Sequence, residues 1–403
     1  MNIIQIQRPI KIGNRLQATI AINGIEKVAN FDVDSTYAEY LDDEVCDAFL
    51  INLLLFAMGN GYDIKCDAPV SAELLFNLRT YFLPILNKET SGKAHLVNIE
   101  ANPLVRETHA IAVGTGISGG IDSSDAIMEN LRASAKIPNM KLTHLLVVTP
   151  TSKRVAFYRP HSQEALLQRA EKISTCLNLP LIKISHNLAD ISDICDERYH
   201  PFYNLSCVFA LGKQFKTYFY ASAYTMDHFS IKNGFNSDAD YMNMFMLPML
   251  STPNLRFYLA GLPRSRLEKT RAIANEKWVQ ENLSVCTNDF IGKKCGFSTC
   301  NANKCKRTMW DLEICGALDK FSKMFDADDF RKNHKQAIAW LYNKAKHGDN
   351  FAQESWNTAK AKNIITKQDL FSLALRNAGL KFILMFIPVS KWRKRIRSKF
   401  YLS

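Results

Sequence analysis

The chain has 403 residues and a formal net charge of +12, with 47% hydrophobic and 22% charged residues. This is the composition of an ordinary globular protein, and the length predicts two or three domains. No stretch reaches the roughly 18 consecutive apolar residues that span a bilayer, and the N-terminus lacks a secretory signal pattern. We therefore expect a cytoplasmic protein whose basic surface either meets a polyanionic partner or is simply solvated.

Residues 1–105 predict a small α+β domain. Short strands cover the first forty residues, and Asn23-Gly24 between two alternating runs predicts a β-hairpin. Apolar residues recur at helical spacing over 43–58 and 70–86, and the segment 94–101 returns to a strand pattern.

Residues 106–285 alternate between strand and helix patterns. The predicted strands are 109–113, 144–148, 181–184 and 217–223, and the predicted helices are 122–135, 162–177 and 207–215. Such alternation predicts an α/β fold with a parallel sheet, helices on both faces and a ligand at the carboxyl ends of the strands. A further helix is expected over 264–282, followed by a cysteine-bearing loop over 286–308 and a mostly helical region over 309–403.

A glycine-rich turn joins the first of these strands to its helix in the segment HAIAVGTGISGGIDSSDAIMENL, 109–131. Its glycines allow unusual backbone angles and a close approach to a ligand. They are Gly114, Gly116, Gly119 and Gly120. The free N–H groups of the turn and the positive end of the helix favour an anion, and Ser118, Ser123 and Ser124 add hydroxyl donors. The segment therefore predicts a phosphate-binding loop.

Three kinds of phosphate loop compete for this segment. GTGISG matches the dinucleotide pattern G-x-G-x-x-G, but the next strand, HLLVVTP, ends without the acidic residue that such a site needs. A Walker-type loop requires a lysine, and the turn has none. The third candidate, SGGIDS at 118–123, resembles the motif S-G-G-x-D-S of the PP-loop ATP pyrophosphatase superfamily. A tight strand–helix turn without a ligand is the structural alternative.

The resemblance implies an adenine nucleotide alpha hydrolase-like sheet that binds ATP, transfers AMP to an acceptor oxygen and releases pyrophosphate. By resemblance, Ser118, Gly119, Gly120, Asp122 and Ser123 would hold the pyrophosphate. Asp122 would also place Mg²⁺ or orient the loop, because a carboxylate beside a polyphosphate needs a cation between them.

Polar residues at other strand ends are weaker candidates. Thr149 ends the second predicted strand, and His186 and Asn187 follow the third, where adenine or an acyl substrate would lie. Their position is the whole argument, and polar residues are common at strand ends for structural reasons. We expect Tyr220 and Tyr224, at the end of the fourth strand, to serve packing and capping rather than an acceptor pocket.

Four cysteines lie within twenty residues of each other in CTNDFIGKKCGFSTCNANKCKRT, 286–308. They are Cys286, Cys295, Cys300 and Cys305. Thiolates at such spacing are typical of a closed tetrahedral zinc site, which would be structural because four ligands leave no open position. An iron–sulfur cluster is the chemical alternative, and free thiols in a loop are the structural one.

This segment also resembles the cysteine knuckle of 7-cyano-7-deazaguanine synthases (QueC-like enzymes), which belong to the PP-loop superfamily. Cys286, Cys295-Gly296 and Arg307 match that frame, although both inner gaps have four residues instead of two. The helix SRLEKTRAIA, 265–274, resembles the lysine-containing helix of the family, which would make Lys269 a second catalytic residue beside the phosphates. A solvated helix lysine is an equally weighted alternative.

The resemblance covers about 109–315 and leaves the flanking regions as additions. It implies an ATP-dependent, AMP-forming carbon–nitrogen ligase with ATP, Mg²⁺ and Zn²⁺, acting on a carboxylate of deazaguanine type, and a place in bacterial defence or specialised modification. Two alternatives stay open: a PP-loop tRNA sulfurtransferase and a nucleotide-sensing module without turnover.

The sequence also leaves several kinds of partner possible. The acceptor is a small-molecule acid or modified base, a protein or an RNA, and the chain could form a homodimer. The basic C-terminal run over 391–399 suggests contact with an anionic surface, or a wet helix face. The sequence identifies neither the acid nor the nitrogen source.

Overall fold

The computed structural model describes the chain except for residues 1, 134–135, 152–161, 193–196, 287–293 and 386–403. The chain separates into two compact units. The first comprises Met1–Ser118 and Asp122–Pro263, and the second comprises Gly119–Ile121 and Arg264–Ser403.

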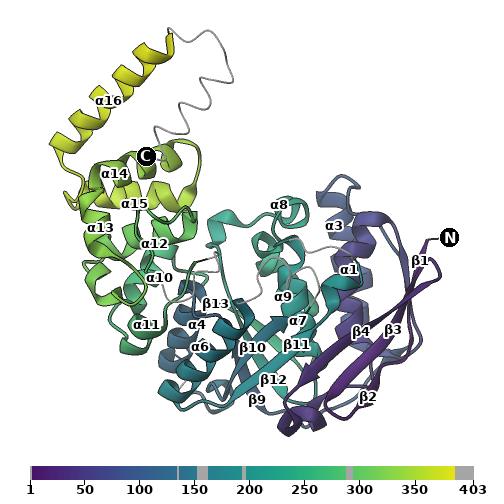
Figure 1. The fold of residues 1–403 in the computed structure, drawn as a ribbon. Coiled ribbons are helices and arrows are strands. Elements are labelled where there is room, and N and C mark those ends of the chain that lie inside the picture. Colours follow the sequence, from purple (N-terminus) through teal and green to yellow (C-terminus); the bar gives the residue numbers. More distant parts are fainter. Residues whose placement is uncertain (1, 134–135, 152–161, 193–196, 287–293, 386–403) are drawn as a thin grey trace. The chain divides into compact units, whose positions relative to one another are not determined.

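A mostly parallel sheet forms the centre of the first unit (Figure 1). In the described part of the chain it has eleven strands, ten of them in the order β13-β12-β9-β10-β11-β4-β3-β1-β5-β7, while β2 pairs with β3. The strands are β1 (Ile3–Ile6), β2 (Ile10–Ile12), β3 (Arg15–Ile22), β4 (Ile25–Val33), β5 (Asp63–Cys66), β7 (Ile99–Glu100), β9 (Ala112–Gly116), β10 (His144–Pro150), β11 (Leu181–His186), β12 (Phe215–Ala221) and β13 (Arg256–Ala260). The predicted α/β class with a mostly parallel sheet is confirmed.

Five parallel strands of this sheet are wound in two directions from β9. The chain runs from β9 to β10 and β11 on one side, and then returns to β12 and β13 on the other side. Because right-handed crossovers place each connecting helix on a defined face, the reversal puts α4 (Ile121–Ala133) and α6 (Ser162–Leu177) on one face and α7 (His200–Ala210) and α9 (Asn243–Leu250) on the other, as Figure 1 shows. The strand order therefore reverses at β9.

The N-terminal strands extend the same sheet. β4 pairs antiparallel with β11, and the predicted hairpin joins β3 to β4 through Asn23-Gly24. Both turn residues have positive φ, 50° and 82°, as a type I′ turn requires. One continuous hydrophobic core runs from Ile4 to Phe257 across both regions, so residues 1–105 do not form a core of their own.

The N-terminal region also forms helices, whose apolar side chains belong to this core. α1 (Asp47–Asn60) is buried along most of its length, and a helical stretch over 72–89 comprises α2 (Ala72–Asn77), a π-helical turn and α3 (Leu83–Glu89). A small second sheet pairs β6 (Val70–Ser71) with β8 (Pro103–Leu104). The helices predicted over 43–58 and 70–86 are therefore present with shifted ends.

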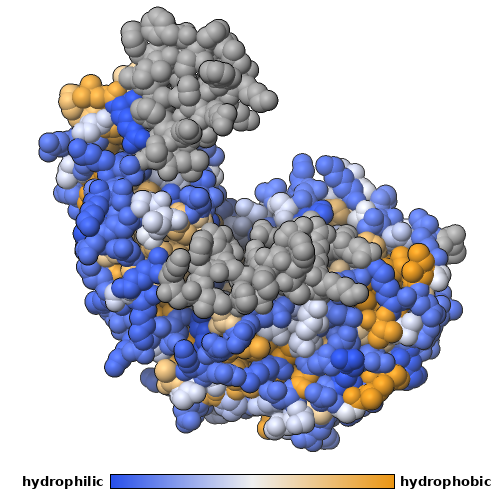
Figure 2. Space-filling model, in the orientation of Figure 1, coloured by the Kyte–Doolittle hydropathy of each residue, from blue (hydrophilic) through white to orange (hydrophobic). Residues whose placement is uncertain are grey.

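Exposed apolar side chains lie on the N-terminal strands, where Figure 2 shows orange patches within a mostly hydrophilic surface. Ile10 and Ile12 lie on β2, while Ile25 and Val28 lie on β4. They are single residues at a sheet edge and a hairpin, as is common on globular surfaces.

Several predicted element boundaries were wrong. The first strand of the α/β region occupies Ala112–Gly116 instead of 109–113, and two glycines within it lie close to aromatic side chains of β12. The helix predicted over 207–215 is α7, which ends at Ala210, and Phe215 already begins β12. Only Ile99–Glu100 of the segment 94–101 is a strand.

The second unit is helical in its described part. Its helices are α10 (Arg266–Ile273), α11 (Lys277–Asn282), α12 (Asn303–Ile314), α13 (Ala327–Lys332), α14 (His334–Lys346), α15 (Asn350–Ala361) and α16 (Lys367–Met385). Buried Trp310 forms its centre, edge-to-face with Phe330 and donating to the Ala337 carbonyl at 3.3 Å. The single helix predicted over 264–282 was wrong, since the chain is extended at Glu276 and begins a new helix there.

No helix in the described residues is long and apolar enough to cross a membrane. The basic run over 391–399 lies outside the described residues.

Candidate functional site

The glycine-rich turn lies at the carboxyl end of β9, where the strand order reverses. β9 ends at Gly116, the Ile117 N–H donates to the Leu146 carbonyl at 2.9 Å, and α4 begins at Ile121. Gly119 has a φ of +75°, a conformation that favours glycine over other residues. In doubly wound sheets this reversal point is where ligands bind, and the start of a helix favours an anion there.

Two predicted serines are close together at this turn. The Oγ atoms of Ser118 and Ser123 lie 3.0 Å apart, and Ser123 is on the first turn of α4 beside Asp122. Ser118, Asp122 and Ser123 therefore place two hydroxyl groups and a carboxylate at the start of α4, all within the first unit. Gly119 and Gly120 complete the same turn, and the Ser284 N–H donates to the Gly119 carbonyl at 2.8 Å within the second unit.

The first two glycines serve packing and not the turn. A Cβ at Gly114 would lie 2.4 Å from the Phe215 ring, and one at Gly116 would lie 3.0 Å from the Tyr218 hydroxyl. Both glycines are within β9, so the expectation that all four glycines shape the turn was wrong. This arrangement also weakens the dinucleotide interpretation, in which the first glycine of G-x-G-x-x-G makes the tight turn.

Arg169 is a residue that sequence reasoning missed. It lies on α6, and its guanidinium donates to the Ser118 carbonyl at 2.9 Å. Burial lowers the pKa of Arg169, although an arginine stays charged at any physiological pH. A cation is therefore held beside the serine that opens the turn. No local motif marks it, because the contact joins positions 51 residues apart.

A buried carboxyl group lies beyond the end of β12. Asp240 accepts hydrogen bonds from the Tyr220 hydroxyl at 3.1 Å and from the Asn243 amide at 2.8 Å. Burial raises the pKa of Asp240 to about 7, and the negative charges of Asp238 and Asp122 raise it further. Asp122 at the glycine turn therefore interacts electrostatically with Asp240, and a cation bound near Asp122 would lower the pKa of Asp240.

Tyr220 and Tyr224 are part of this hydrogen-bonded network. The Tyr224 hydroxyl donates to Asp238 at 3.1 Å, and its ring stacks on Tyr241 with centroids 4.1 Å apart. The cavity beside Tyr224 and Asp240 is only about 10 Å³, roughly the size of one water molecule. This supports the expected packing role.

The remaining strand-end candidates are committed to structural contacts. The Asn187 amide bridges to β4, accepting from the Asn30 N–H at 2.8 Å and donating to the Val28 carbonyl at 2.8 Å. The buried hydroxyl of Thr149 donates to the Ile184 carbonyl at 3.4 Å. Burial lowers the pKa of His186 to about 3, so this ring is neutral at physiological pH. Contact of Asn187 or Thr149 with a nucleotide stays a prediction.

Lys269 belongs to the second unit, on α10. This helix begins with a capping box in which the Ser265 hydroxyl accepts from the Glu268 N–H and Glu268 accepts from the Ser265 N–H. The Lys269 side chain is 1% exposed, so the alternative of a solvated helix lysine is wrong. A fully buried ammonium is uncommon and needs polar or charged surroundings, and the predicted role beside phosphates stays untested.

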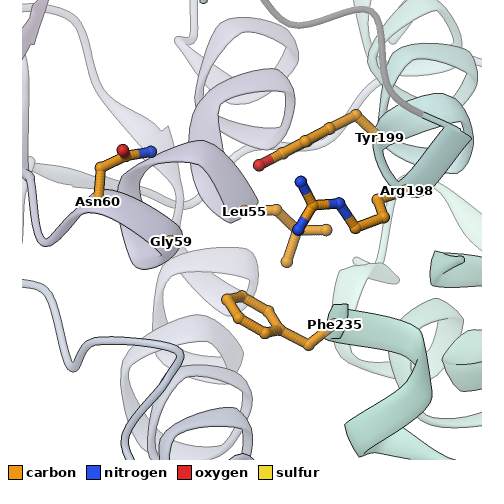
Figure 3. A pocket seen from close by; sticks show the side chains of 6 residues that line it. All are labelled: Leu55, Gly59, Asn60, Arg198, Tyr199 and Phe235. Atoms are coloured by element: carbon orange, nitrogen blue, oxygen red, sulfur yellow. The ribbon is translucent and has the colours of Figure 1, made fainter. Parts of the chain in front are cut away.

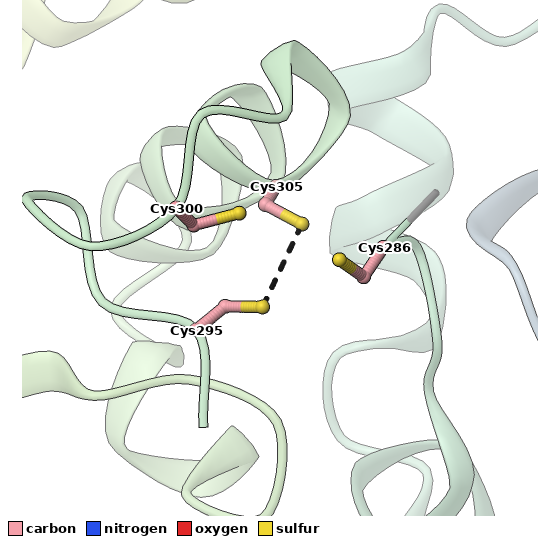
Figure 4. Close-up of side chains that lie close together, drawn as sticks. All are labelled: Cys286, Cys295, Cys300 and Cys305. Carbon is pink, nitrogen blue, oxygen red and sulfur yellow. Dashed lines mark hydrogen bonds between the residues drawn. The ribbon is translucent and has the colours of Figure 1, made fainter. Parts of the chain in front are cut away.

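The four clustered cysteines converge in the second unit (Figure 4). The Sγ atoms of Cys286, Cys295, Cys300 and Cys305 all lie within 4.8 Å of one another, and those of Cys295 and Cys305 are 3.9 Å apart. Three of these cysteines are buried, and Cys286 is half-buried. Cys305 lies on the first turn of α12, so the loop predicted over 286–308 ends earlier than expected. The cluster can hold a metal ion.

Backbone contacts fix the cysteine loop in place. The Cys295 N–H donates to the Met324 carbonyl at 2.8 Å, and the Cys295 carbonyl accepts from the Asp326 N–H at 3.1 Å. The Asp329 carboxylate accepts from the Ser298 N–H and hydroxyl at 2.9 and 2.5 Å. It lies so close to Gly296 that a Cβ there would be 2.6 Å from its oxygen. The glycine after Cys295 is therefore required for this fit.

The thiols of the cluster favour a charged form at Cys295. Hydrogen bonding from Cys305 lowers the pKa of Cys295 to about 6, against the opposing effect of burial. Thiolates are the form that binds metals, so a gathered set with one acidic member suits a metal site.

Comparisons of the chain with protein-family models, with curated proteins and with solved structures found no match.

Proposed function

We propose that the chain is an ATP-dependent, AMP-forming ligase of the PP-loop type. The observation that carries the proposal is the Ser118–Ser123 hydroxyl pair, which flanks the positive-φ Gly119 at the point where the strand order reverses. The order β11-β10-β9-β12-β13 and the Arg169 guanidinium beside Ser118 support an anion-binding role for this turn. Among possible anions we propose the pyrophosphate group of ATP, because SGGIDS resembles the PP-loop motif.

The turn would hold the β- and γ-phosphates of ATP. Backbone N–H groups at the start of α4 and the Ser118 and Ser123 hydroxyls would donate to phosphate oxygens, and Arg169 would add a positive charge. The Asp122 carboxylate would bind Mg²⁺, and the bound ion would neutralise charge on the departing pyrophosphate. Lys269 is the second proposed cation.

The reaction proposed is adenylation followed by transfer. A carboxylate oxygen of the acid attacks the α-phosphorus of ATP, the bond to the β-phosphate oxygen breaks, and pyrophosphate leaves with its electron pair. The lone pair of an amine or ammonia then attacks the acyl carbon, AMP leaves, and the nitrogen loses a proton to give the amide. The protein contributes mainly positioning and electrostatic stabilisation.

The cysteine cluster is proposed to hold structural zinc. With Zn–S bonds of about 2.3 Å, a tetrahedral ion separates its sulfur ligands by roughly 3.8 Å. The 3.9 Å between Cys295 and Cys305 fits this value, and the 4.8 Å limit on the whole set suits one ion better than a larger iron–sulfur cluster. Four thiolates leave no open position, so this zinc takes no part in the chemistry.

The acid, by resemblance, is a deazaguanine carboxylate. The experiment incubates purified protein with α-labelled ATP, Mg²⁺, ammonium and carboxy-deazaguanine, and follows the label. Label in AMP that appears only with the acid supports the ligase, and the isosteric variant Asp122→Asn should abolish it. ADP as product would contradict the proposal. ATP binding without turnover would instead favour the nucleotide-sensing module.

A tRNA sulfurtransferase is less well supported, because such an enzyme needs reactive cysteines. The four clustered cysteines converge on one another, as a metal site requires. If replacing one of these cysteines abolished sulfur transfer and left the metal content unchanged, the sulfurtransferase would become the preferred function.

A further inference from the structure

A cavity of about 220 Å³ lies in the first unit and is lined by none of the residues assigned above (Figure 3). Its walls come from the end of α1, from η5 (Glu197–Tyr199) and from α8 (Ile231–Asn236). The lining residues are Leu55, Gly59, Asn60, Arg198, Tyr199 and Phe235. Half of the lining therefore comes from the N-terminal region, which lies outside the part of the chain that resembles PP-loop enzymes.

The lining combines one cation with apolar rings. Figure 3 shows the Arg198 guanidinium between the Tyr199 and Phe235 side chains, and it lies 5.6 Å from the centroid of the Tyr199 ring. Leu55 is 2% exposed and forms an apolar wall, while Asn60 adds an amide at the rim. A guanidinium fork pairs with a carboxylate through two parallel hydrogen bonds, and aromatic faces accept a flat ring.

The size of the cavity limits the ligand. A dry cavity of about 150 Å³ accepts benzene, whereas drug-sized ligands occupy roughly 300 Å³ or more. A volume of 220 Å³ therefore suits one or two fused rings with a small substituent.

Gly59 forms part of the cavity wall. A Cβ built there would lie 3.9 Å from the Tyr199 hydroxyl and 4.0 Å from the Phe235 ring, which are ordinary contact distances. An alanine would therefore fit without displacing a neighbour, whereas a longer side chain would extend between the two rings. The position offers a matched pair of substitutions.

Ring contacts join one wall of the cavity to the end of β11. His186 ends β11, its ring lies 5.7 Å from that of Tyr203, and Tyr203 stacks on Tyr199 with centroids 6.4 Å apart. On the other wall, Gly234 of α8 packs closely against Met242, two residues from Asp240.

From this geometry we propose that the cavity is a binding site for a planar aromatic carboxylate, with Arg198 pairing the carboxylate and the side chains of Leu55, Tyr199 and Phe235 contacting the ring. Binding needs neither ATP nor the chemistry proposed above, so the two proposals can fail separately.

Ligand-observed NMR titrations of the full chain test the proposal with indole-3-carboxylate as the probe. A probe of about twelve non-hydrogen atoms should bind with a Kd in the millimolar range or below. The neutral indole-3-carboxamide and the non-planar cyclohexanecarboxylate should each bind at least about tenfold more weakly, because they lack the charge or the flat ring.

Variants place the binding in the cavity. Gly59→Leu should abolish binding of indole-3-carboxylate, and Gly59→Ala should retain it. Arg198→Gln should weaken this binding about tenfold or more and provides a second test if Gly59→Leu does not fold. Equal binding of the acid and the amide, equal binding by Gly59→Leu and Gly59→Ala, or no binding by the unmodified chain would each overturn the proposal.

Discussion

Ser118 and Ser123 face each other across the glycine turn with their hydroxyl oxygens 3.0 Å apart, although the backbone between them contains the positive-φ Gly119. This hydroxyl pair therefore closes the turn on itself. Groups held in place in advance lose little freedom on binding, which raises affinity for a matching anion.

Removal of one hydroxyl tests this arrangement. Ser123→Ala should weaken ATP binding about tenfold, because a hydrogen bond to a charged phosphate is lost. Ser230→Ala is the control, since Ser230 caps α8 by accepting from the Asn233 N–H at 3.1 Å. The control should lose about 1 kcal/mol of stability and no ATP affinity. Equal ATP affinity in both variants, measured by calorimetry, would show that the turn does not bind the nucleotide.

Arg169 should contribute charge to the same site. Arg169→Gln is expected to reduce ATP affinity about tenfold and to flatten the dependence of that affinity on salt. Arg331→Gln removes a charge from an exposed pair with Asp319 in the second unit and should change neither quantity. Binding titrations at two ionic strengths provide the comparison, and an unaltered Kd for Arg169→Gln would count against a phosphate-binding role.

The cysteine cluster predicts one bound metal per chain. Cys305→Ser should remove most of the zinc, found by elemental analysis, and lower the Tm by roughly 10 °C or more, since structural zinc contributes several kcal/mol. Cys176→Ser changes an exposed cysteine outside the cluster and should alter neither property. Full zinc content in Cys305→Ser, or iron in the unmodified protein, would contradict the assignment.

Asp240 predicts a pH effect on stability. Its pKa rises from the ordinary 3.8 to about 7 in the folded protein, so between these values the folded state binds a proton that the unfolded state has released. Stability from this group therefore falls as pH rises from about 4 to 7 and stays low above 7. The asparagine in Asp240→Asn cannot ionise, so this variant should not lose stability from this position as pH rises.

Denaturation curves at several pH values check the effect. The stability difference between Asp240→Asn and the unmodified chain should grow in favour of the variant up to about pH 7 and then level off. His186, whose pKa burial lowers to about 3, gives the opposite slope at acid pH, but it is present in both proteins and cancels in the difference. A difference independent of pH would show that Asp240 keeps an ordinary pKa.

Features that depend on neighbours along the chain could be predicted from the sequence. The Asn23-Gly24 hairpin follows from two residues that tolerate positive φ, and the strand–turn–helix around 118–123 follows from glycines between an apolar run and a helical pattern. The four cysteines were recognised as a set because their spacing is short, and the structure brings their sulfur atoms together. Local backbone preference and short spacing are written directly in the residue order.

Only the tertiary structure decided features that join distant positions. It joined β4 to β11 and so placed the first strands in the central sheet, it committed the Asn187 amide to β4, and it brought Arg169 to Ser118. It also formed the cavity around Arg198 from three separate helical segments. Such contacts depend on how buried surfaces fit together across many residues, and burial is a property of the packed chain that no local pattern contains.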